Sequence, residues 1–245
     1  MSSSAHVAFI SDVHGNVHAL KAVLADIQSE GISDIVCLGD IVGYGGNPSE
    51  CVDLIREMSI PSVLGNHDAM TDESRVPRQI MNPDAKQAID WTRNALLPEQ
   101  LTWLASLPMR IERESFEAVH ATLHCPEEWD YVQSILDAGK NFEHQKRDLC
   151  FIGHTHRPAF YVEGEDRTRD VTSIESVTAG RKQLINVGSV GQPRDREERA
   201  CYLVYRPERK DVCWRRVDYD IEAAQSAILA AGLPPRFAYR LSHGK

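Results

Sequence analysis

The sequence lacks a segment that would anchor the chain in a membrane, and it lacks a cysteine pattern typical of disulfide bonds. The apolar run over residues 5–10 is too short for a signal-peptide core or a membrane span. The six cysteines never stand in a Cys-x-x-Cys spacing, and several lie inside apolar runs, where a thiol acts as a small hydrophobic group. We therefore expect six reduced, structural cysteines, no membrane partner and a cytoplasmic location.

Positive charge is also scarce. The 27 Lys and Arg residues are outnumbered by 36 Asp and Glu, which gives a formal net charge of −9 at pH 7. Because long nucleic acids are held by basic side chains that neutralise their phosphates, this balance disfavours a long nucleic acid as a partner. A small anionic substrate remains compatible with an acidic chain if bound metal supplies positive charge locally.

The first 65 residues alternate short apolar runs with amphipathic segments. The runs at 7–10, 35–38 and 62–64 are predicted to be strands buried on both faces. The segments between them are predicted to be helices, because their apolar residues recur on one helical face. This βαβαβ order predicts a parallel sheet with right-handed crossovers.

The remainder of the chain is richer in strands. Helices are predicted over 84–107, in two pieces of which the second starts at Pro98, and over 220–231, followed by a polar tail from Pro234. The predicted strands are 109–114, 116–120, 149–153, 158–163, 171–178, 183–187, 200–206 and 211–218, with hairpin turns at Ser115 and Gly164–Arg169.

This pattern predicts an α/β fold, a four-layer α/β/β/α sandwich of two mixed sheets flanked by helices. Neither an internal repeat nor a linker is evident, so we expect one domain over residues 1–245. Residues 70–107 would form a helical insert near the active-site cleft.

Five short polar motifs each fall where a predicted strand ends. They are Asp12-Val13-His14-Gly15-Asn16, Gly39-Asp40, Gly65-Asn66-His67-Asp68, Val119-His120 and Gly153-His154-Thr155-His156. Ligands of open α/β sheets bind beyond the carboxyl ends of the strands, so the motifs can converge on one edge. Asp, Asn and His are ligands of divalent metals. Gly153-His154-Thr155-His156 alone has an even chance of being a metal site, and each of the other motifs alone more often has a structural role such as a turn or a buried histidine. The ordered set predicts a metal site.

The ordered set, over residues 12–156, resembles the calcineurin-like metallophosphoesterase superfamily. Segments 39–45, 186–195, 233–235 and 240–241 are similar to a bacterial subfamily of small phosphoesterases and phosphodiesterases. Two positions depart from the usual pattern: Ala121 replaces a glycine, and Val187 replaces a proline.

The resemblance implies a hydrolase that cleaves a small phosphomonoester or phosphodiester through a hydroxide bridging two divalent metal ions, which would be Mn, Fe, Ni or Zn. The implied ligands are Asp12, His14 and His156 for one ion and Asn66, His120 and His154 for the other, with Asp40 between them. His67 would be the general acid that protonates the leaving oxygen, and Asp68 would orient His67 and keep it cationic.

Relatives similar to protein Ser/Thr phosphatases carry Asp-Arg-Gly after the Gly-Asp motif, and this chain has Ile-Val-Gly-Tyr-Gly there. Arg194 is our candidate for the missing phosphate contact, with a surface ion pair to Asp195 or another neighbour as an equal alternative. Three aromatic residues are candidate cleft walls or ordinary core and rim residues: Tyr44, Trp91 and Trp129.

Three other functions compete with this interpretation of the sequence. A non-catalytic scaffold of the same fold for protein interaction is the main alternative, but such scaffolds tend to lose the general acid or several ligands, and all of these are present. A nuclease acting on DNA ends would need a larger and more basic chain. An aspartyl-phosphate phosphatase would need Asp-x-Asp, and His14 stands at the second position.

Overall fold

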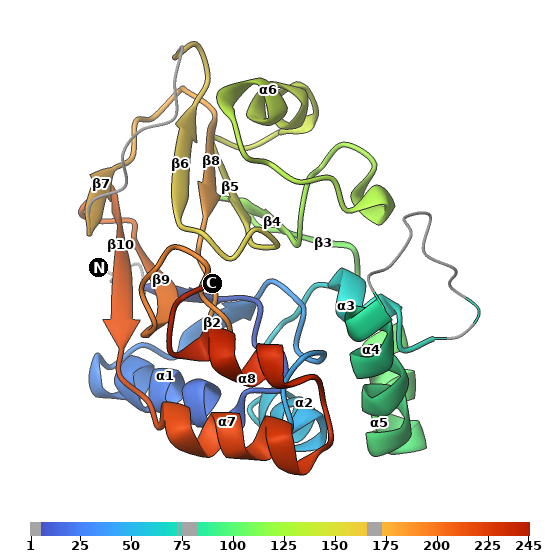
Figure 1. Cartoon of the computed structure of the whole chain (residues 1–245). Coiled ribbons are helices and arrows are strands. Elements are labelled where there is room, and N and C mark those ends of the chain that lie inside the picture. Colours follow the sequence, from blue (N-terminus) through green and yellow to red (C-terminus); the bar gives the residue numbers. More distant parts are fainter. Residues whose placement is uncertain (1–5, 73, 75–82, 166–172) are drawn as a thin grey trace.

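Two five-stranded sheets stack face to face in the computed structural model, which describes residues 6–72, 74, 83–165 and 173–245 (Figure 1). The first sheet has the order β2 (Asp34–Cys37), β1 (Val7–Ile10), β9 (Ala200–Arg206), β10 (Asp211–Val217) and β7 (Ile174–Ser176). The second has the order β3 (Arg110–Glu112), β4 (Glu117–Val119), β5 (Leu149–Ile152), β8 (Gln183–Asn186) and β6 (Ala159–Val162). Each sheet contains parallel and antiparallel pairs. The predicted pair of mixed sheets is confirmed.

Helices cover both outer faces (Figure 1). Those beside the first sheet are α1 (Val17–Ser29), α2 (Pro48–Glu57), α7 (Ile221–Ala230) and α8 (Pro235–Leu241). The second sheet is covered by α6 (Ile135–His144). At the side, α4 (Pro83–Ala95) and α5 (Pro98–Ala105) pack against α2, and the short α3 (Asn66–Ala69) contacts α5. A single 3-10 turn covers Pro126–Glu128. The four-layer arrangement is therefore the predicted one.

Strand β1 shows how the sequence produces these layers. Successive side chains of a strand point to opposite faces, so Ala8 and Ile10 pack toward the helices while Val7 and Phe9 pack toward the second sheet. The Phe9 ring stacks on that of Phe151 in β5, with centroids 3.9 Å apart. Both faces of β1 are thus buried, which fixes the position of the polar residues that follow Ile10.

Several elements differ from prediction. Residues 62–64 form no strand but only a single parallel bridge between Ser62 and Cys37. The predicted hairpin at Gly164–Arg169 is wrong, because β6 pairs with β8 whereas β7 pairs with β10 in the other sheet. Residues 166–169 of that hairpin, like 73 and 75–82 of the predicted insert, lie outside the described residues.

The prediction of a polar tail from Pro234 is also wrong, because the helix α8 forms there. The helix α6 has no counterpart among the predicted elements. Pro235 occupies the first turn of α8, a position where its missing N–H is harmless and its fixed φ favours the helix. Phe237 and Leu241 of α8 are buried against α7. The two consecutive prolines therefore start a helix rather than an irregular tail.

The six cysteines are all unpaired. Four of them are buried and structural, as predicted: Cys37, Cys51, Cys150 and Cys201. Cys125 is exposed and Cys213 half-buried, so the prediction is wrong for Cys125. Among the described residues, no helix is both long and apolar enough to cross a membrane.

Candidate metal centre

All seven predicted ligands lie together where the two sheets meet, and all are buried. Asp12 and His14 follow β1, Asp40 follows β2, and Asn66 begins α3. From the second sheet, His120 follows β4, and the pair His154 and His156 follows β5. Within each sheet the carboxyl ends of these strands lie at the same edge, as the parallel pairings β1–β2 and β4–β5 require.

Three ligand atoms form a first group. His14 Nε2 lies 3.1 Å from His156 Nε2. Asp12 Oδ1 lies 3.4 Å from His156 Nε2 and 3.8 Å from His14 Nε2. The three atoms surround a common point, an arrangement that suits a divalent cation bound by imidazole and carboxylate.

A second group is centred on His120. Its Nε2 lies 3.1 Å from Asn66 Oδ1 and 3.1 Å from His154 Nδ1. Asp40 joins the two groups, because its Oδ2 is 3.4 Å from His120 Nε2 and 3.6 Å from His14 Nε2. The spatial grouping is the one that the resemblance implies.

The outer nitrogens of three histidines fix their tautomers. His14 Nδ1, His120 Nδ1 and His156 Nδ1 each donate to a main-chain carbonyl, those of Val42 (3.1 Å), Leu38 (2.7 Å) and Gln192 (2.6 Å). A carbonyl can only accept, so the proton is on Nδ1, and in the neutral ring Nε2 carries a free lone pair. Metal-bound histidines in proteins are oriented by this kind of outer hydrogen bond.

The facing lone pairs and an unpaired carboxylate oxygen both fit a bound cation. Burial lowers the pKa of His14 and His156 well below the usual value, so both rings are neutral at pH 7. Two neutral acceptors 3.1 Å apart repel each other unless a positive ion lies between them. Asp12 Oδ1 is buried and has no hydrogen-bond partner within the described part of the chain. A metal ion would satisfy it.

The backbone at the ligands is strained. Five of the seven have left-handed φ values: Asp12 (52°), His14 (49°), Asp40 (51°), His154 (67°) and His156 (59°). For residues other than glycine this conformation has a free-energy cost of order 1–3 kcal/mol each and gathers at functional sites. The cost is difficult to explain by packing alone, because each turn aims a ligand atom at the same place.

His67 lies beside the first group and forms a further candidate cluster with His14 and Asp40, in which one ligand atom of each residue lies within 4.8 Å of the others. Its main-chain N–H donates to Asp40 Oδ1 at 2.8 Å, and its ring is 4.8 Å from the His14 ring and 4.4 Å from the Tyr44 ring. The Nδ1 atom is buried and has no partner among the described residues. Burial lowers the pKa of His67, against the opposite effect of the Asp40 carboxylate.

Asp68 does not contact His67 in the way that was predicted. Its Oδ1 accepts the N–H groups of Ile41 (2.9 Å) and Val42 (3.2 Å), and its Oδ2 accepts that of Gly65 (3.1 Å). The carboxylate thus holds the loop that carries Asp40, and no hydrogen bond joins it to His67 in the described structure. We correct its expected role to that of a residue that positions this loop.

Gly43 makes room for the His67 ring. Its φ is 92°, and a Cβ added there would lie 2.5 Å from His67 Nδ1. We expect Gly43→Ala to displace the ring and to reduce phosphoester turnover roughly 100-fold, the loss typical of a misplacement of about 1 Å. Metal content, measured by elemental analysis, should not change.

The control for this variant is Gly180→Ala. Gly180 also has a positive φ, 76°, but has nothing within 4 Å of an added Cβ. It therefore reproduces the backbone strain of about 1–2 kcal/mol without the contact to His67. If both variants lost activity equally, the effect of Gly43→Ala would be one of stability and our interpretation would be wrong.

Arg194 lies near the centre but makes no ion pair with Asp195. Asp195 pairs with Arg216 instead, while Arg194 donates to Gln192 Oε1 at 2.8 Å. The Arg194 guanidinium lies 5.8 Å from the centroid of the Tyr44 ring. An ion pair between Arg194 and Asp195 is therefore excluded.

The aromatic candidates separate into two kinds. Tyr44 lies against His14 and His67, and the Trp129 ring lies 5.8 Å from that of His120. Trp91 instead packs with the cluster under α7 and α8 and is an ordinary core residue. Tyr131, which the sequence did not single out, stacks on His154 at 4.1 Å and is 45% exposed, so it forms part of the rim.

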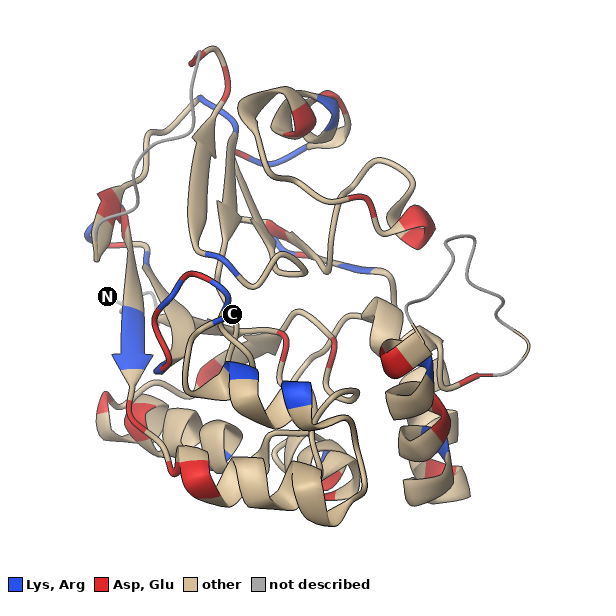
Figure 2. Cartoon of the chain, in the orientation of Figure 1, with Lys and Arg blue, Asp and Glu red and all other residues tan. Residues whose placement is uncertain are grey.

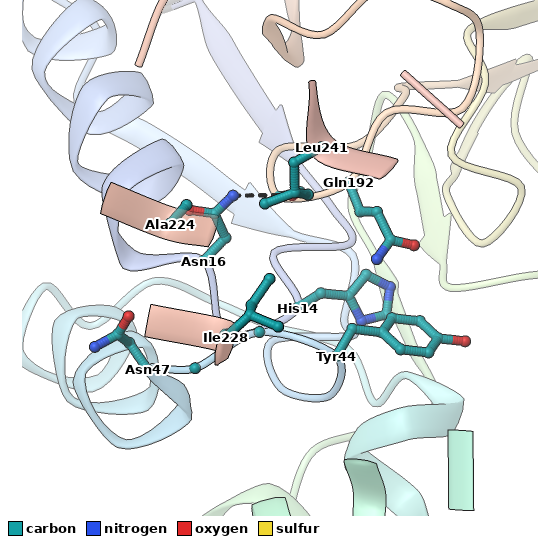
Figure 3. Close-up of a pocket in the computed structure, with 12 residues that line it drawn as sticks. His14, Asn16, Tyr44, Asn47, Gln192, Ala224, Ile228 and Leu241 are labelled. Carbon is teal, nitrogen blue, oxygen red and sulfur yellow. Dashed lines mark hydrogen bonds between the residues drawn. The ribbon is translucent and has the colours of Figure 1, made fainter. Parts of the chain in front are cut away.

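A pocket adjoins the centre behind His14 (Figure 3). His14, Tyr44 and Gln192 gather on one side of it, and Asn16, Asn47 and Ala224 lie on the other (Figure 3). Its remaining lining comes from glycines and from the apolar Ile228 and Leu241. No Asp, Glu, Lys or Arg side chain lines this pocket.

Comparison with known proteins agrees with this geometry. The family profile described as the calcineurin-like phosphoesterase superfamily domain matches residues 6–210. An uncharacterised protein of Methanocaldococcus jannaschii is 39% identical over 250 residues, which covers 98% of each chain. Serine/threonine-protein phosphatase 1 of Salmonella typhimurium is 27% identical over 128 residues, 47% of this chain and 58% of the phosphatase.

Among solved structures, a metallophosphoesterase from Sphaerobacter thermophilus superposes with a TM-score of 0.88 at 38% identity, covering 98% of this chain and 99% of that one. A hypothetical protein from Pyrococcus horikoshii has the same fold, with a TM-score of 0.79 at 20% identity and coverage of 98% and 99%. With the profile match over most of the chain, these similarities show that the protein is a phosphoesterase, a hydrolase of the calcineurin-like phosphoesterase superfamily.

Proposed function

We propose that the chain hydrolyses a small phosphomonoester or phosphodiester with two divalent metal ions, held by the two ligand groups and bridged by Asp40. The observation that carries this proposal is the position of Asp40 Oδ2, 3.6 Å from His14 Nε2 and 3.4 Å from His120 Nε2. A carboxylate between two imidazole groups at these distances suits a pair of ions about 3.5–4 Å apart.

The residues divide the work as follows. Bound metal ions would activate water as the nucleophile and neutralise charge on the phosphoryl oxygens. His67 would protonate the leaving oxygen, because its ring is buried beside His14 and Asp40 and its Nδ1 has no hydrogen-bond partner among the described residues. Arg194 would bind the phosphorylated substrate at the edge of the centre, and Tyr44 would line the approach. The protein itself needs no covalent nucleophile.

The proposed ions also reconcile an acidic protein with an anionic substrate. Two divalent cations would outweigh the carboxylates of Asp12 and Asp40 and make the centre locally positive. The formal charge of −9 would still disfavour a long nucleic acid. We retain the small substrate and the cytoplasmic location as predictions.

Metal addition and removal test the proposal. Dialysed protein should bind two Mn²⁺ or equivalent ions per chain by elemental analysis, and should then hydrolyse p-nitrophenyl phosphate or its bis-ester. Ligand binding to the native state alone stabilises by about 2.7 kcal/mol at 100 times the Kd, so metal should also raise the Tm by several degrees. A chelator should reverse both effects.

Two results would contradict the proposal. One is protein that binds metal and gains stability yet turns over neither ester with manganese, nickel, zinc, iron or magnesium, which would favour a scaffold. The other is full activity with fewer than two ions per chain. The Asp34→Asn variant, which changes a carboxylate at the start of β2 away from the ligands, serves as the matched control.

A further inference from the structure

Two arginine side chains meet on one amide oxygen at the edge of the metal centre. Arg194 Nη2 and Arg240 Nη1 both donate to Gln192 Oε1, at 2.8 and 3.0 Å. Arg194 lies in the loop between β8 and β9, whereas Arg240 lies in α8. The fold thus brings two cationic groups, 46 positions apart in the sequence, to a single neutral acceptor.

Neither guanidinium has an acidic side chain as a partner in the described part of the chain. The other hydrogen bond of Arg240 goes from Nε to the main-chain oxygen of Lys245. Nearby acids are paired elsewhere, Asp195 with Arg216 and Asp84 with Arg236. Burial, together with the charge of Arg194, lowers the pKa of Arg240 to about 10. Among the described residues the pair is therefore a concentration of positive charge without an acidic side-chain partner.

The arginine pair is connected directly to the ligands. Arg194 N–H donates to the main-chain oxygen of His156 at 3.1 Å, and the main-chain oxygen of Gln192 accepts from His156 Nδ1 at 2.6 Å. The Arg194 guanidinium also lies over Tyr44, whose ring is 4.8 Å from that of His14. The pair accordingly flanks the first ligand group, with Arg194 nearer to it.

We propose that Arg194 and Arg240 bind a second phosphoryl group of the substrate while the ligand groups hold the phosphoryl group to be hydrolysed. The inference rests on the proposed function and narrows it to small phosphoesters that carry a second phosphoryl group a few bonds away. Guanidinium groups bind phosphate oxygens through paired, charge-assisted hydrogen bonds. Helix α8 contains Arg236 and Arg240 and no acidic residue, on a chain whose net charge is negative, and Figure 2 shows this helix with blue and without red segments.

Competitive inhibition of p-nitrophenyl phosphate hydrolysis tests this proposal in the metal-loaded protein. The inhibitors are methylphosphonate, methylenediphosphonate and 1,3-propanediphosphonate, at a fixed concentration of free metal. We expect the wild type to bind a diphosphonate at least about tenfold more tightly than methylphosphonate, since hydrogen bonds to charged groups contribute about 1.5–3 kcal/mol. Preference for the methylene compound would indicate directly linked phosphoryl groups, and preference for the propane compound separated ones.

Variants of Arg240 test its part in binding the second phosphoryl group. Arg240→Gln should reduce the preference for the diphosphonate about tenfold, and Arg240→Lys, which keeps the charge, should retain part of it. Arg236→Gln is the matched control, because it removes a charge from the same helix but from a side chain that pairs with Asp84. Its inhibition constants should equal those of the wild type.

Three outcomes would overturn the inference: no preference in the wild type, an unchanged preference in both Arg240 variants, or an equal loss in Arg236→Gln. An Arg240 that only fastens the end of the chain through Lys245 would give the second outcome, with a lower Tm. Absence of any turnover by the wild type would instead contradict the proposed function. The two failures are therefore distinguishable.

Discussion

Asp40→Asn should abolish most of the phosphoester turnover, by about a thousandfold or more, and should lower the metal content from two ions per chain to one or none. The expected size follows from the several kcal/mol that bound metal contributes to the transition state, at 1.36 kcal/mol for each tenfold change in rate. Asp40 Oδ2 is the one carboxylate oxygen that the structure places within 4 Å of imidazole nitrogens from both groups among the described residues.

Elemental analysis and steady-state kinetics on the same preparation check this expectation. Asp34→Asn should behave like the wild type, because Asp34 forms a half-buried ion pair with Arg113 away from the ligands, and ion pairs near the surface contribute about 0–1 kcal/mol. Folding is verified by circular dichroism. A folded Asp40→Asn that kept two ions and activity within tenfold of the wild type would rule out the bridging role.

His67→Gln should impair hydrolysis in a way that depends on the leaving group. Loss of a general acid reduces rates by about 10²–10⁴-fold when the leaving oxygen needs a proton. Phenyl phosphate has such a leaving group, whereas p-nitrophenolate leaves without protonation, so its hydrolysis should fall far less. Metal content should stay at the wild-type value, because our proposal assigns His67 to neither ligand group, although it lies in a cluster with His14 and Asp40.

The ratio of the two substrates is the measurement that matters. His18→Gln on α1 is the control, a histidine change outside the ligand groups. An equal loss on both substrates, or a loss of bound metal, would show that His67 acts on the metal centre rather than on the leaving group.

The ligands could be predicted because the residues next to each of them in the sequence show where it lies in the fold. Each stands directly after an apolar strand or at the start of α3, so the chain order alone places Asp12 and Asp40 at one sheet edge. The grouping needed the family pattern, because strand periodicity gives no contact between β1 and β5. Strand assignments failed mainly at 62–64, where one bridge forms instead of a ladder, and at β6 and β7, which part into different sheets.

Contacts that depend on the path of a loop were beyond the sequence. Asp68 follows His67, and adjacency favoured a contact between them, yet main-chain N–H groups of the Asp40 loop compete successfully for its carboxylate. Gln192 and Arg240 lay within segments that resemble the subfamily, but neither residue type indicates that they meet. Gln192 and Arg240 meet only because α8 packs beside the centre, and the sequence predicts a polar tail in place of this helix.

The division of the ligands between the two sheets has a mechanical consequence. Asp12 and His14 extend from β1, while His154 and His156 extend from β5, and Phe9 and Phe151 stack across the interface just behind them. An ion bound by Asp12 and His156 would link the two sheets, and a displacement of one sheet relative to the other would break its coordination. Substrate would then be hydrolysed at the same contact that fixes the position of the two sheets relative to each other.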